Sequence, residues 1–149
     1  ARGLTVNVFT NRLHYFVDRH LGLTVGPDRA RRMKAARDAW DVWGGDCAIH
    51  SDAPVTPMGP LKTAWIAVNR LTETGQSMGT SQQITVPQAL HNITMGAAYV
   101  LKLDHKVGSI QCGKSADFTV LDGDPLEVDP LELKDIPIVA TVLGGEVMA

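Results

Sequence analysis

This chain of 149 residues contains few cysteines and few aromatic residues, and neither sign of charge is in marked excess. The two cysteines, Cys47 and Cys112, are too few for a disulfide scaffold. Aromatic residues make up 5% of the chain, and 14 Lys and Arg against 16 Asp and Glu leave a formal net charge of −2. A balance this close to neutral provides no general electrostatic footprint for nucleic acid. We therefore expect no nucleic-acid partner.

Long apolar runs and a signal peptide are missing as well. No charged residue occurs between Glu73 and Lys102, yet Gln82, Pro87 and Asn92 interrupt that stretch. A membrane span needs about 20 predominantly apolar residues in succession. We therefore expect no membrane partner, and the start of the sequence lacks the pattern of a signal peptide. The compartment stays open, with a slight preference for the cytoplasm.

The residues that are abundant indicate a globular protein. Apolar residues make up 44% of the chain and charged residues 20%, which is typical of a folded domain and argues against disorder. A chain of this length can bury roughly 68–70% of the surface of its unfolded form. The composition therefore allows a sizeable hydrophobic core.

Strand and helix patterns alternate over the first part of the chain. Residues 4–9 have the length and β-branched content of a short buried strand, and residues 11–20 can form a helix. A second helix is expected from Pro27 to the Gly44-Gly45 pair. One face of this helix carries the apolar residues Met33, Ala36, Trp40 and Trp43.

A second strand and further helices follow. Residues 47–51 predict a strand, and a helix with one apolar face is expected from Pro60. Thr85 and Gln88 have the spacing of a capping box, in which each side chain binds a free backbone N–H at the start of a helix. Strand, helix, strand, helix and helix, up to about residue 103, are typical of parallel α/β architecture.

The pattern changes after residue 103. Short strands and tight turns replace the helices in this last part. The expected strands are residues 108–110, 116–121, 138–143 and 146–148. We therefore predict an α/β part over residues 1–103 and a small β part over residues 104–149.

The strand at residues 47–51 runs into His50-Ser51-Asp52. Because a strand projects alternate residues to the same side, His50 and Asp52 are expected to lie together at its C-terminal end. Catalytic groups collect at that end in parallel α/β barrels, and a carboxylate there can bind a divalent metal or accept a proton from water. In the structural alternative, Asp52 caps the Ala53-Pro54 turn and His50 is a core histidine.

Two other chemistries do not fit these residues. Ser51 and His50 are adjacent on a strand, so they point to opposite sides and cannot act as nucleophile and base. Cys47 and His50 also face opposite ways and cannot share a metal ion. We expect Cys47 and Cys112 to be small buried apolar residues.

Several short motifs follow one another in a fixed order along the chain. They are residues 48–55, Arg70 late in the next helix, Gln88-Ala89-Leu90, Gly108-Ser109-Ile110, residues 113–118 and Gly144-Gly145. In this order they resemble the C-terminal end of the amidohydrolase superfamily, from about residue 5 onward. The most similar group is the amidohydrolase family 3 branch, which includes N-substituted formamide deformylase-like enzymes and exoenzyme regulatory proteins.

The resemblance implies a fragment of a metal-dependent hydrolase, with part of a (β/α)8 TIM barrel and part of a small β-sandwich. It implies that Asp52 is both a metal ligand and a catalytic residue, and that His50 flanks this site and either binds the substrate or lines the site. One or two divalent metal ions, expected to be zinc, would activate water for attack on a C–N bond of an amide, a cyclic amide or a related small molecule. Asp52 would carry the proton from that water to the leaving nitrogen.

Much of such an enzyme has no counterpart in this sequence. The other metal ligands of the family lie on earlier barrel strands, whereas a catalytic metal usually needs about three protein ligands. About two barrel strands can be identified, and closure takes eight strands and roughly 250 residues. We therefore expect this chain to be inactive and without a metal when alone, and its open edges to favour a homo-oligomer. The alternative is a non-catalytic regulatory or interaction module.

Overall fold

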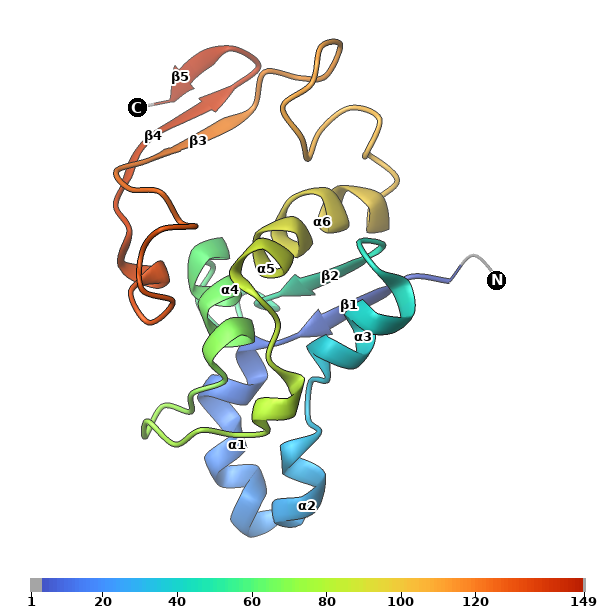
Figure 1. Cartoon of the computed structure of the whole chain (residues 1–149), viewed down its shortest axis with the longest axis vertical. Coiled ribbons are helices and arrows are strands. Elements are labelled where there is room, and N and C mark those ends of the chain that lie inside the picture. Colours follow the sequence, from blue (N-terminus) through green and yellow to red (C-terminus); the bar gives the residue numbers. More distant parts are fainter. Residues whose placement is uncertain (1–3, 149) are drawn as a thin grey trace.

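A two-stranded parallel sheet lies within the helical part of the fold (Figure 1). β1 (Val6–Phe9) pairs with β2 (Cys47–His50), and in this register Phe9 lies opposite His50. Parallel neighbours need a long crossover connection, which α1 (Asn11–Leu23), α2 (Gly26–Arg31) and α3 (Ala36–Trp43) provide here. This computed structural model describes residues 4–148. It confirms the mixed α/β class.

The helix predicted from Pro27 to Gly44-Gly45 is interrupted, so that prediction was wrong in its middle. α2 ends at Arg31 and α3 begins at Ala36. Between them Lys34 has a backbone φ of 54°, a left-handed conformation that residues other than glycine seldom adopt. The N–H of Ala36 donates to the carbonyl of Lys34 at 2.8 Å, which closes a tight turn. The apolar spacing is helical on both sides of this turn, so spacing alone could not reveal it.

Four helices contact β2 in the described part of the chain: α3 and the three helices that follow β2. The latter are α4 (Pro60–Asn69), α5 (Val86–Ile93) and α6 (Met95–Val100). The capping box at the start of α5 is confirmed, because the Thr85 hydroxyl accepts the N–H of Gln88 and the Gln88 amide accepts the N–H of Thr85. No helix in the described part of the chain has both the length and the hydrophobicity needed to cross a membrane.

The core lies between this helical layer and one face of the sheet. Val8 and Ile49 are paired neighbours in the sheet, and both pack with apolar residues of α1 and α4. Because side chains alternate along a strand, Phe9 and His50 belong to the opposite face. Cys47 is buried, as predicted, but Cys112 is exposed. The prediction for Cys112 was wrong because this residue lies in an exposed turn. The hydrophobicity of a cysteine does not show whether its surroundings are buried.

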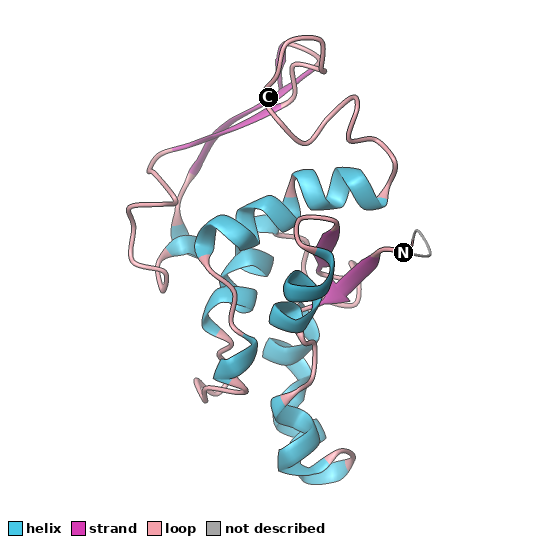
Figure 2. Cartoon of the chain, turned by 45° about the vertical axis from the view of Figure 1, so that its right-hand side comes forward, coloured by secondary structure: helices cyan, strands magenta, loops and turns pink. Residues whose placement is uncertain are grey.

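The last part of the chain forms an antiparallel sheet with the order β3-β4-β5. Its strands are β3 (Phe118–Leu121), β4 (Ile138–Leu143) and β5 (Glu146–Met148). Figure 2 shows this sheet at the end of the molecule opposite α1 and α2. Val139, Leu143 and Val147 are exposed on it. Self-association stays a prediction, and these exposed apolar side chains support it.

Residues 108–110 do not form the predicted strand. Gly108 has a φ of 93°, and a Cβ atom placed there would lie 2.7 Å from the Cβ of Ala98 in α6. The ammonium group of Lys114 donates to the Ser109 hydroxyl at 2.7 Å and to the carbonyl of Val107 at 3.3 Å. Contacts with α6 and Lys114 therefore replace the strand pairing that the local pattern predicted.

Replacing Gly96 with alanine is expected to destabilise the junction of α6 and β2. A Cβ atom at Gly96 would lie 2.0 Å from the carbonyl oxygen of Cys47, the first residue of β2. Because that neighbour is backbone, the helix must move, at a cost of about 1–3 kcal/mol. Urea denaturation measures the change in the free energy of unfolding.

Gly22→Ala is the matched control for this substitution. Gly22 lies in α1, where a Cβ atom would meet nothing within 4 Å. Alanine there is expected to change stability by less than about 1 kcal/mol, in the favourable direction. Equal stability of the Gly96→Ala and Gly22→Ala proteins would contradict the close approach of α6 to β2.

Candidate functional site

The carboxyl ends of β1 and β2 bring an aromatic ring and an imidazole together. The rings of Phe9 and His50 stack, with centroids 5.2 Å apart and an interplanar angle of 27°. Each is the last residue of its strand. Parallel α/β folds bind ligands at this edge of the sheet, so the stacked pair marks the candidate site.

Asp52 lies just beyond the end of β2. The strand ends at His50, and Asp52 has a φ of 58°, so the alternation of a strand does not extend to it. Its carbonyl accepts the N–H of Val55 at 2.8 Å, which closes a turn through its backbone. The Asp52 side chain is exposed and has no ion-pair partner among residues 4–148. Its carboxylate is therefore free to bind a cation or a proton.

His50, Asp52 and Lys34 are close enough to influence one another electrostatically. Partial burial lowers the pKa of His50, the Asp52 carboxylate opposes that shift, and the Lys34 ammonium group adds to it. Partial burial and the charge of Arg12 lower the pKa of Lys34, and Asp52 again acts in the opposite direction. The site thus holds one acidic and two basic charged groups around a histidine.

Hydrogen bonds join the end of β1 to the loop after β2. Asn11 is fully buried, and its amide donates to the Thr56 hydroxyl at 3.1 Å. The Thr56 hydroxyl donates to the carbonyl of Ser51. The buried Thr10 hydroxyl and the side-chain oxygen of Asn11 have no hydrogen-bond partner among the described residues. This link fixes the His50–Asp52 segment relative to β1.

Sequence reasoning missed Asn11, Phe9 and Lys34 as members of the site. Asn11 comes almost directly after the predicted strand at residues 4–9, and polar residues at that position were a usable signal. Phe9 could be placed only once its register with His50 was known. Lys34 had no local signal, because a tertiary contact brings it there.

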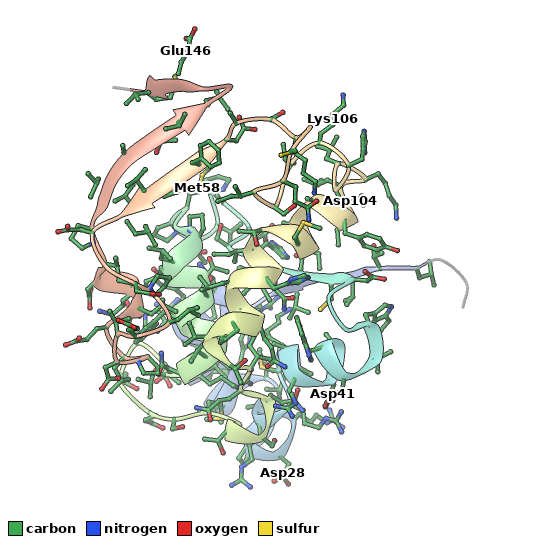
Figure 3. All side chains as sticks on the ribbon, turned by 45° about the horizontal axis from the view of Figure 1, so that its top comes forward. Asp28, Asp41, Met58, Asp104, Lys106 and Glu146 are labelled. Atoms are coloured by element: carbon green, nitrogen blue, oxygen red, sulfur yellow. The ribbon has the colours of Figure 1, made fainter. Side chains whose placement is uncertain are left out.

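A small hollow of about 140 Å³ adjoins His50. Its wall includes Ser51, Met58, Pro60 and Thr63, and Figure 3 labels Met58 on the loop that precedes α4. A larger and more open groove of about 780 Å³ lies between α3 and residues 80–85. We place the candidate site at the smaller hollow, because His50 lines it, whereas Asp52 and Lys34 line neither hollow.

Asp52 can supply one ligand to a metal ion but not a complete site. No group of three or more His, Cys, Asp or Glu side chains suited to hold a metal occurs within residues 4–148. An exposed carboxylate without a partner fits as an oxygen ligand of a divalent ion. A hydrolytic metal centre that used Asp52 would need about two further ligands.

Comparisons with known proteins find sequence relatives and a similar fold. The model of the amidohydrolase family matches residues 1–149. YtcJ of Bacillus subtilis, whose name describes an amidohydrolase, is 37% identical over 123 residues, which cover 78% of this chain and 23% of YtcJ. N-substituted formamide deformylase of Arthrobacter pascens is 31% identical over 98 residues, which cover 66% of this chain and 18% of that enzyme.

A solved structure has a similar fold. The crystal structure of a Xaa-Pro dipeptidase with bound methionine superposes with a TM-score of 0.61 at 22% identity, over 96% of this chain and 34% of the dipeptidase. The chain spans less than a quarter of the length of the two curated relatives above. Because the family model matches residues 1–149, this chain belongs to the amidohydrolase family.

Proposed function

We propose that this chain is the C-terminal part of a metal-dependent hydrolase that acts on C–N bonds of amides, cyclic amides or related small molecules. The observation that carries the proposal is the position of His50 and Asp52 at the carboxyl end of a parallel strand, in a chain of the amidohydrolase family. β1 and β2 would be the last two strands of a TIM barrel. The sheet β3-β4-β5 would be part of a small β-sandwich, with the boundary near residue 103.

Asp52 would act at the centre of this chemistry. A divalent metal, which we propose to be zinc, supplies an activated water and polarises the substrate when it is bound. The Asp52 carboxylate would serve as one oxygen ligand, accept a proton from the attacking water and deliver it to the leaving nitrogen. Its exposure, and its lack of an ion-pair partner in the part of the chain that the structure describes, support this role.

His50 would bind the substrate beside Asp52. Its ring is held by the stack on Phe9 and borders the small hollow. Partial burial lowers the pKa of His50, which favours the neutral imidazole near pH 7. A neutral imidazole can donate a hydrogen bond to a carbonyl oxygen of the substrate or accept one from an amide N–H.

The metal dependence can be tested on the full-length protein that contains this chain. Dialysis against a chelator should abolish hydrolysis of N-substituted formamides and cyclic amides, and added zinc should restore it. The 149-residue chain by itself is expected to bind zinc no more tightly than its Asp52→Ala variant, because one carboxylate cannot hold a hydrolytic metal.

Two results would contradict the proposal. Stoichiometric zinc binding with turnover by the 149-residue chain alone would refute its status as part of a larger site. A full-length protein that lacks both metal and turnover on every C–N substrate tested would instead favour a non-catalytic regulatory module.

A further inference from the structure

Lys34 places a cation next to the His50–Asp52 site without a stabilising ion pair. Its Nζ atom lies 5.6 Å from the centroid of the Phe9 ring, and that ring stacks on His50. The side chain is half-buried, and the described residues form no ion pair with it. Partial burial of an ammonium group is costly, and the attraction of an aromatic ring offsets only part of that cost. Stability alone therefore does not explain its position.

The backbone around Lys34 is held by a buried arginine. Arg70 is 1% exposed, and its guanidinium group donates to the carbonyls of Lys34 at 2.9 Å, Met33 at 2.8 Å and Met78 at 2.8 Å. No carboxylate pairs with Arg70 among the described residues. The hydrogen bonds that Arg70 donates to these backbone carbonyls therefore fix the segment that carries Lys34.

The same segment is tightly packed from a second side. A Cβ atom at Gly79, next to Met78, would lie 1.9 Å from the carbonyl oxygen of Arg31. Lys34 itself has a φ of 54°, so its backbone is strained. Strained and tightly held residues cluster at binding sites, where the surrounding structure sets the position of a functional side chain.

The charges around Lys34 favour an anionic ligand. Arg12 is close enough to repel it electrostatically, and among the described residues the guanidinium of Arg12 hydrogen-bonds only to the ring of His20. Within residues 4–148, Asp52 is the one acidic group that acts on Lys34 and on His50. Two cations, Lys34 and Arg12, therefore stand against one carboxylate, and the charge around Lys34 is positive on balance even without a metal ion.

We propose that Lys34 binds a carboxylate group of the substrate and so gives the site a preference for anionic C–N substrates. The proposal rests on the function proposed above and specifies its substrate class. The carboxylate would lie beside Phe9, with the scissile group toward His50 and Asp52. A flexible ammonium group on a fixed backbone can follow a carboxylate while the ring of Phe9 limits its range.

Binding of two matched ligands to the metal-free, full-length protein tests this assignment. N-acetylglycine carries a carboxylate, and N-acetylglycinamide is its neutral counterpart of nearly equal size. Isothermal titration calorimetry should show N-acetylglycine bound about tenfold more tightly than N-acetylglycinamide, since a hydrogen bond between two charged groups is stronger than one to a neutral group. Lys34→Met should abolish the difference between the two ligands, and Lys34→Arg should retain part of it.

Lys62→Met serves as the matched control. Lys62 is also half-buried, and its Nζ atom lies over aromatic rings, 6.0 Å from the centroid of Tyr15 and 5.4 Å from that of Trp65. It belongs to α4, and the rings are those of α1 and α4. Its replacement should leave the preference for N-acetylglycine unchanged.

Three outcomes would overturn the assignment: equal binding of the two ligands by the unaltered protein, no binding of either ligand, or an equal loss for both ligands in Lys34→Met. The last would indicate a structural role, and the conservative Lys34→Arg variant would then behave like the unaltered protein toward both. Because no turnover is measured, a protein that prefers the carboxylate but hydrolyses no C–N bond would contradict only the proposed function.

Discussion

Replacing Asp52 with asparagine should lower kcat for C–N hydrolysis by the full-length enzyme on the order of 10³-fold, or about 4 kcal/mol of transition-state stabilisation. The amide keeps the size of the side chain but cannot accept the proton of the attacking water. It also binds a divalent cation less well, because the negative charge is gone. Steady-state kinetics on an N-substituted formamide, with saturating zinc, measures the loss.

Asparagine is the informative replacement at this position. Asp52 has a φ of 58°, and asparagine tolerates this left-handed conformation better than alanine does. The side chain is exposed, so the melting temperature should stay nearly unchanged. Asp28→Asn, an exposed aspartate at the start of α2 (Figure 3), is the matched control and should keep full activity. An Asp52→Asn enzyme with undiminished kcat would remove Asp52 from the mechanism.

Replacing Arg70 with methionine is expected to cost about 3 kcal/mol or more of folding free energy. The guanidinium group satisfies the carbonyls of Met33, Lys34 and Met78, and methionine fills part of the space without donating a hydrogen bond. Each buried carbonyl that loses its donor costs about 1–3 kcal/mol. Against this, burial disfavours the charged guanidinium and lowers the pKa of Arg70 to about 10, so part of the loss is offset.

Urea denaturation of Arg70→Met, Arg70→Lys and Arg29→Met distinguishes this role from a general effect of charge. Lysine has one ammonium group and cannot reach three carbonyls in the same geometry, so it should restore only part of the stability. Arg29 is exposed in α2, and its replacement should change stability by less than about 0.5 kcal/mol. Equal stability of Arg70→Met and Arg29→Met would show that the three hydrogen bonds contribute nothing.

Local patterns predicted the elements whose signals lie within a few residues. The helix from Pro60 and the capping box of Thr85 and Gln88 depend on contacts between neighbours in the sequence, and both were found. The interruption at Lys34 was not predicted, because a buried arginine 36 residues away stabilises it. The strand predicted at residues 108–110 was wrong for the same reason, because contacts with α6 and Lys114 set the conformation of this segment.

The candidate site was predictable only in part. His50 and Asp52 follow from the position of a strand end, which a sequence pattern can indicate. Their relative placement does not, because Asp52 lies in a left-handed turn rather than on the strand. Phe9 and Lys34 reach the site through strand register and through the arginine contact, and neither kind of information is local.

The hydrogen bonds of Arg70 also have a dynamic consequence. They connect residues 33–34, before α3, with Met78, beyond α4, across 44 positions of sequence from Lys34 to Met78. Segments that share one buried donor cannot open separately without exposing it, so they should fluctuate as a single cooperative unit. The segment that carries Lys34 would then be as rigid as the helices next to it, and the entry of a ligand would depend on motion of other segments.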